Sequence, residues 1–187
     1  MSAVTSPFPA PSHAAHFIAP TRGVSCTMKI DRLGRSGTRS NVSSVYALKD
    51  GRYREERSSC VVVFDGTALW MSPRAGGPVL RGSAQPTVLD EMLDPSRLFE
   101  SHFASTRSAE HAGRSCLAVA LRAAEDSTDA DHELIMDVES GMAIFWRDRR
   151  AGREVSISDV QWDVSFDEAM FHFEPEAHHS IVEVTFA

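Results

Sequence analysis

The side chains best suited to acid–base chemistry are one carboxylate and two imidazoles, those of Asp159, His102 and His132. A carboxylate or imidazole that faces an apolar pocket has a displaced pKa and can give or take a proton. Asp159 stands where the apolar phase of a strand-like run slips by one residue. That slip predicts a β-bulge, and bulges often turn a side chain toward a site. Two structural alternatives stay open: a polar bulge residue at Asp159, and a hydrogen-bonded core imidazole at His102.

No motif in the sequence identifies a catalytic site. The patterns G-x-S-x-G, H-E-x-x-H, G-x-G-x-x-G and the P-loop are all missing, so the catalytic residues are unknown and the three above are candidates only. His178 and His179 point to opposite faces of an extended chain and cannot both bind one metal ion. We expect no metal and no cofactor, and we favour a binding protein over an enzyme.

Large apolar side chains form the leading candidate for a binding site. We expect them to line a cavity for an apolar small molecule or acyl chain, with core packing as the alternative interpretation of each. The six residues are Trp70, Phe99, Phe103, Met136, Trp146 and Trp162.

The elements that must position these residues are strands, because apolar and polar side chains alternate through most of the chain. The alternation predicts strands at 23–32, 41–49, 52–57, 60–64, 67–71 and 79–81, and further strands after Gly113. One helical unit of about 16 residues, broken near Asp94, interrupts them, and the apolar stripe of its second part consists of Leu98, Phe99, His102 and Phe103. The predicted fold class is α+β: an open antiparallel β half-barrel with a helical lid over its concave apolar face. We expect one short lid to leave part of that face unfilled.

Composition indicates a single globular domain. The chain has 187 residues, 42% of them hydrophobic, and a net charge of −7, which disfavours nucleic acid as a partner. We expect a flexible arm at 1–21, rich in proline, and one half-barrel domain at 22–187. No run of about 20 apolar residues predicts an integral membrane segment. No signal peptide or lipidation motif is visible, which predicts a cytoplasmic protein, or an exported one if the N-terminus has been re-engineered.

The order of the turns and strands resembles the lipoprotein carrier-like superfamily. The resemblance lies in an early pair of hairpins, a mid-chain helix, an Asp-to-Gly hairpin and a closing F-x-F-x-P element, and it covers roughly residues 23–177. These segments are 50–56 and 62–70, 93–98, 137–142, and 166–168 with 171–175. The group includes LolA-like periplasmic lipoprotein carriers and sigma-E regulatory periplasmic proteins. The resemblance implies a half-barrel whose cavity holds acyl chains, lipids or apolar peptide segments.

Three functional hypotheses remain open. The first is a carrier that holds an acyl chain, a lipid or a hydrophobic metabolite. The second is a small enzyme that cyclises, isomerises or hydrolyses a hydrophobic metabolite in a biosynthetic pathway. The third is a regulatory domain whose groove binds a peptide, so a protein partner is possible. The ligand and the oligomeric state do not follow from the sequence.

Overall fold

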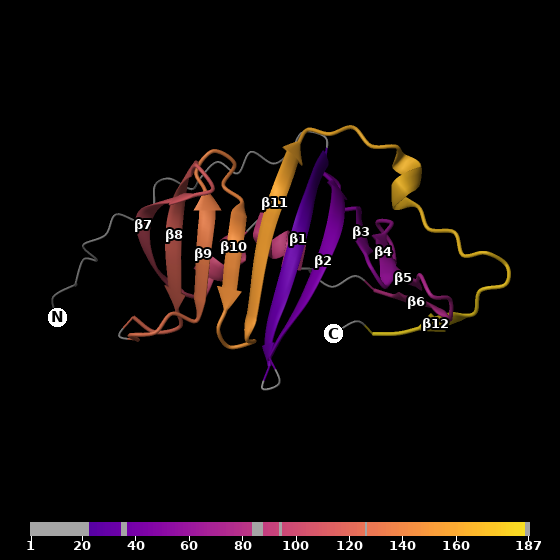
Figure 1. Cartoon of the computed structure of the whole chain (residues 1–187), viewed down its shortest axis with the longest axis horizontal. Helices are drawn as coiled ribbons and strands as arrows, with labels where there is room; N and C mark the ends of the chain where they lie inside the picture. Colours follow the sequence, from indigo (N-terminus) through magenta and orange to yellow (C-terminus); the bar gives the residue numbers. More distant parts are fainter. Residues whose placement is uncertain (1–22, 35–36, 84–87, 94, 126, 186–187) are drawn as a thin grey trace, which may run out of the picture.

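The computed structural model describes residues 23–34, 37–83, 88–93, 95–125 and 127–185. The arm expected at 1–21 lies outside this part of the chain. The described strands form one open sheet in the order β12-β6-β5-β4-β3-β2-β1-β11-β10-β9-β8-β7 (Figure 1). Their bounds are β1 Gly23–Gly34, β2 Gly37–Leu48, β3 Tyr53–Arg57, β4 Cys60–Phe64, β5 Leu69–Pro73, β6 Val79–Gly82, β7 Phe103–His111, β8 Arg114–Arg122, β9 His132–Asp137, β10 Ala143–Asp148, β11 Arg153–Trp162 and β12 Ile181–Glu183.

The sheet is mixed, whereas the sequence predicted an antiparallel one. Neighbouring strands are antiparallel except that β12 pairs parallel to β6, with Ile181 opposite Val79. The parallel pair arises because the chain after β11 runs past β3–β5 before it returns to the sheet edge (Figure 1). Such a long return cannot be inferred from local alternation.

Two short helices replace the predicted helical unit: α1 (Val88–Leu93) and α2 (Ser96–Glu100). Both lie behind the sheet in the view of Figure 1, and α1 packs against β10. The sheet surface toward them is called the helix-side face below. Asp94, where the break was predicted, lies outside the described residues.

Strand register shows which side chains share the helix-side face, because residues directly opposite one another point to the same side. One row across the sheet is apolar for most of its length: Val119, Leu134, Trp146, Val155, Ile30 and Asn41. The next row toward the β1–β2 turn is mainly polar: Leu121, His132, Asp148, Arg153, Arg32 and Arg39. The apolar core therefore gives way to charge at one end of the strands.

The opposite face of β2–β5 is covered by the segment that follows β11. This segment contains the short 3-10 helix η1 (Glu168–Phe171), and its phenylalanines pack on the sheet. Phe166 meets Tyr46 at a ring separation of 5.8 Å, and Phe173 meets Trp70 at 5.4 Å. Strand β4 is thus covered on both sides, and Val63 is fully buried.

The predicted bulge at Asp159 is confirmed. Ser25 lies opposite Gln161, and Thr27 lies opposite Ser158. Between these two pairs β1 has one residue and β11 has two, so β11 contains one extra residue. Asp159 has a φ of 54°, the left-handed conformation that occurs in one type of bulge and that aspartate tolerates better than most residues.

Candidate functional site

The candidate site is the apolar part of the helix-side face together with the helices α1 and α2, whose side chains pack against it. Met92 of α1 is fully buried in the same core cluster as the sheet residues, and Leu98 and Phe99 of α2 pack against that cluster. Met136 and Trp146 are buried on this face, and Trp162 is partly buried against it. Four of the six predicted ligand-binding residues, Phe99, Met136, Trp146 and Trp162, are therefore brought to one core.

The other two predicted ligand-binding residues lie elsewhere. Trp70 is on the opposite face, where its indole Nε1 donates to Asp65 Oδ2 at 2.8 Å. Phe103 was expected on the helical stripe, and that placement is wrong because it begins the strand β7. Its side chain is 48% exposed, on the face away from the helices.

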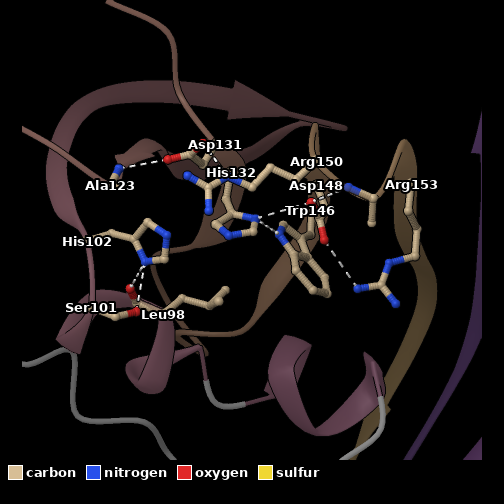
Figure 2. Close-up of polar contacts among 11 residues, drawn as sticks. Leu98, Ser101, His102, Ala123, Asp131, His132, Trp146, Asp148, Arg150 and Arg153 are labelled. Carbon is tan, nitrogen blue, oxygen red and sulfur yellow. Dashed lines mark hydrogen bonds and ion pairs between the residues drawn. The ribbon is translucent and has the colours of Figure 1, made fainter. Parts of the chain in front are cut away.

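Two of the three catalytic candidates meet at the polar end of the face. The rings of His102, just after α2, and His132 on β9 are 4.9 Å apart and nearly perpendicular (Figure 2). His102 Nδ1 lies 2.9 Å from the carbonyl oxygen of Leu98, so its ring also caps the end of α2. Trp146 Nε1 donates to His132 Nδ1 at 3.4 Å.

The surroundings of His132 favour its neutral form. Burial is the largest cause that lowers its pKa, and His102 lowers it further, while Asp148 opposes the shift. Asp148 Oδ1 lies 3.8 Å from His132 Nδ1, and its other oxygen is 3.6 Å from Arg153 Nη2. Arg153 in turn stacks on Trp146, with its guanidinium carbon 4.6 Å from the ring centroid. The cluster joins α2 to β9, β10 and β11.

The third catalytic candidate is not part of this cluster. Asp159 is exposed at its bulge and accepts a hydrogen bond from Ser158 Oγ at 3.0 Å. The structure therefore brings the two candidate imidazoles into contact and leaves Asp159 apart from them. Within the described ranges, no three or more His, Cys, Asp or Glu side chains are grouped to hold a metal ion.

Sequence reasoning missed a basic hollow of about 300 Å³ beside the apolar core. Its lining contains three arginines from β1, β2 and β3, namely Arg32, Arg39 and Arg57. Ile30, Ser40 and Asn41 complete it. A larger hollow of about 470 Å³ lies over β7–β10 and includes Arg107, Ile135 and Phe145, which the register places on the face opposite the helices. Arg32, Arg39 and Arg57 form no recognisable motif in the sequence. They come together because β1, β2 and β3 pair with one another.

No helix within the described residues has the length and apolar character to cross a membrane.

Comparison with solved structures shows the fold. An uncharacterized conserved protein from Thermus thermophilus aligns with a TM-score of 0.58 at 11% identity, over 87% of this chain and 91% of that one. MucB aligns with a TM-score of 0.47 at 15% identity, over 84% of this chain and 59% of that one. A LolA superfamily protein from Nitrosomonas europaea aligns with a TM-score of 0.43 at 9% identity, over 82% and 91%.

No protein-family profile and no curated protein matches the sequence. The cytoplasmic location predicted above is not upheld by these comparisons, in which the aligned structures include MucB and a LolA superfamily protein. That prediction was based on the first residues, which lie outside the described part of the chain. Members of the group named in the resemblance, MucB and a LolA superfamily protein, are thus among the solved structures that align with this chain, and the fold itself is shared with the Thermus thermophilus protein.

Proposed function

We propose that this protein binds an amphiphile or lipid by its acyl chain, between the helix-side face and the helices α1 and α2. The observation that carries the proposal is that short helices pack against the apolar face. Its cover consists of helices of six and five residues, attached through a few apolar side chains.

Helices of this length do not persist on their own, because nucleation is costly and few hydrogen bonds repay it. The first turn of α2 also has no side-chain cap, since Pro95 occupies the N-cap position. The cover therefore depends on its contacts with the sheet, chiefly those of Met92, Leu98 and Phe99. Elements held by few buried contacts open at a lower free energy than the rest of a domain. We infer that α1 and α2 act as a lid, and that an acyl chain takes their place on the sheet.

The surface beneath this lid suits a guest of variable shape. The core cluster contains four buried methionines, whose flexible side chains adapt to different neighbours. Met28, Met136 and Met142 belong to the sheet side of the cluster, and Met92 belongs to the lid itself. We propose Phe99, Met136, Trp146 and Trp162 as the side chains that contact the ligand. The carrier role implied by the superfamily resemblance supports this proposal.

Intrinsic fluorescence provides a local test. A variant with Trp70→Phe and Trp162→Phe keeps Trp146 alone, buried under the proposed lid. Titration with palmitate should change its emission in a saturable way, at one ligand per chain. The matched control carries Trp146→Phe and Trp162→Phe, so that only Trp70 on the opposite face reports. A silent Trp146 together with no palmitate retained by the unmodified protein would overturn the proposal.

A further inference from the structure

The basic hollow lined by Arg32, Arg39 and Arg57 is the strongest feature outside the apolar site. The chain as a whole carries a net charge of −7, so this local cluster of positive charge differs in sign from the protein as a whole. Asn41, which lies opposite Ile30 on the same face, adds an amide group to its wall, and the volume of about 300 Å³ exceeds what a single water molecule occupies.

Two of the three arginines have charges that are unpaired among the described residues. Arg57 donates to both oxygens of the buried Glu55, at 2.8 Å from Nε and 2.6 Å from Nη2. Arg32 and Arg39 form no ion pair within the part of the chain that the structure describes. They lie directly opposite each other on β1 and β2 and point to the same face. Like charges held side by side raise the local affinity for an anion.

A fourth arginine extends this basic row toward the apolar site. Arg153 on β11 lies directly opposite Arg32, and its Nε is buried without a hydrogen-bond partner among the described residues. A buried donor left unpaired is costly, so an acceptor at this end of the face would be favourable. Asp148 balances part of the charge at a distance of 3.6 Å.

The hollow is continuous with the apolar face. Ile30 lines the hollow and also packs against the main core cluster. In its row, Val155 and Trp146 follow on the next two strands, which are spaced about 4.8 Å apart. A charged group in the hollow could therefore be joined to a chain that runs along this row and under the helices.

We infer that the hollow binds an anionic headgroup, a phosphate or a carboxylate, of the amphiphile whose chain occupies the apolar face. The inference rests on the proposed function. Guanidinium groups suit this role, since each presents parallel N–H donors that match two oxygens of a phosphate or carboxylate. Arg32 and Arg39 are the side chains that supply the recognition, and Ile30 marks where the headgroup ends and the chain begins.

Isothermal titration below the micellar concentration tests this with three compounds: dodecyl phosphate, dodecyl maltoside and inorganic phosphate. The unmodified protein should bind dodecyl phosphate at least tenfold more tightly than dodecyl maltoside. Arg32→Gln with Arg39→Gln should remove that preference and leave the maltoside affinity unchanged. The control, Arg107→Gln with Arg149→Gln, removes the same charge elsewhere and should keep the preference.

The outcomes separate this inference from the function on which it rests. Binding of both dodecyl compounds with equal affinity overturns the headgroup site and leaves the carrier intact. Binding of neither overturns the carrier proposal itself. Inorganic phosphate that binds as tightly as dodecyl phosphate would identify a site for a free anion. If both double variants lose the preference for dodecyl phosphate equally, the preference reflects net charge and not this hollow. Either result overturns the inference.

Discussion

Met92 provides a test of the lid, because its truncation should lower the stability of the protein and at the same time tighten ligand binding. This side chain is fully buried and belongs to α1, so its contacts exist only while the helix is docked. Truncating a buried methionine to alanine costs about 2–5 kcal/mol, from lost burial and the cavity left behind. If the lid opens alone, the cost falls on the closed form. A loss of about 2 kcal/mol then raises the open population roughly 30-fold.

Ligand affinity should rise for the same reason. When a ligand binds only the open form, its apparent dissociation constant is the intrinsic constant divided by the open fraction. Met92→Ala should therefore bind dodecyl maltoside up to about 30-fold more tightly, while the protein becomes less stable. Titration calorimetry gives the affinity, and hydrogen exchange of the amides at 88–93 and 96–100 reports the opening. These amides should exchange faster while those of β10 and β11 stay protected.

A second methionine supplies the control. Met142 is also buried in the main core cluster, but it precedes β10 and belongs to the sheet. Met142→Ala should destabilise the protein by a similar amount without tightening ligand binding. The lid hypothesis is refuted if Met92→Ala leaves the affinity unchanged or weakens it while the helix amides remain protected.

Three further outcomes follow from single side chains. Although burial opposes the shift, hydrogen bonds from Ala68, Thr67 and Trp70 lower the pKa of Asp65, so its stabilising effect is present above pH 4 and is lost as pH falls. Asp65→Asn should cost about 1–3 kcal/mol in urea unfolding at pH 7 and less below pH 4; an equal cost at both would contradict this. Burial lowers the pKa of His132, so the folded state favours the neutral ring and its contribution is lost as pH falls below about 6.5. His132→Gln should weaken the dependence of the melting temperature on pH between 7.5 and 5.5, and an unchanged slope would argue against it. Asp159→Gly should raise stability by up to about 1 kcal/mol, because of the positive φ, and should leave palmitate affinity unaltered; a weaker affinity would restore Asp159 as a site residue.

Local alternation predicted much of the sheet, because a strand with one buried face has apolar residues at every second position. The slip near Asp159 could be seen for that reason. The strand β7 was missed since nearly all of its side chains are exposed, which leaves no apolar phase to detect. Phe103 then looked like one more helical position after Leu98 and Phe99, although it starts that strand.

The site was harder to predict than the strands. Alternation does not show which side of the sheet an apolar phase faces, and Trp70 was misplaced because the segment after β11 builds a second apolar layer on the opposite face. The contact between His102 and His132 and the row of arginines both depend on register between strands distant in sequence. Pairing of that kind is set by tertiary packing, so no local pattern reveals it.

Native mass spectrometry of the protein purified without organic extraction, before and after addition of palmitate, tests the central claim most directly. We predict a one-to-one complex with an apolar or amphiphilic molecule, which extraction removes and palmitate restores. A bare chain in both samples, with α1 and α2 equally protected from exchange in each, would contradict the claim that the helix-side face accepts an acyl chain.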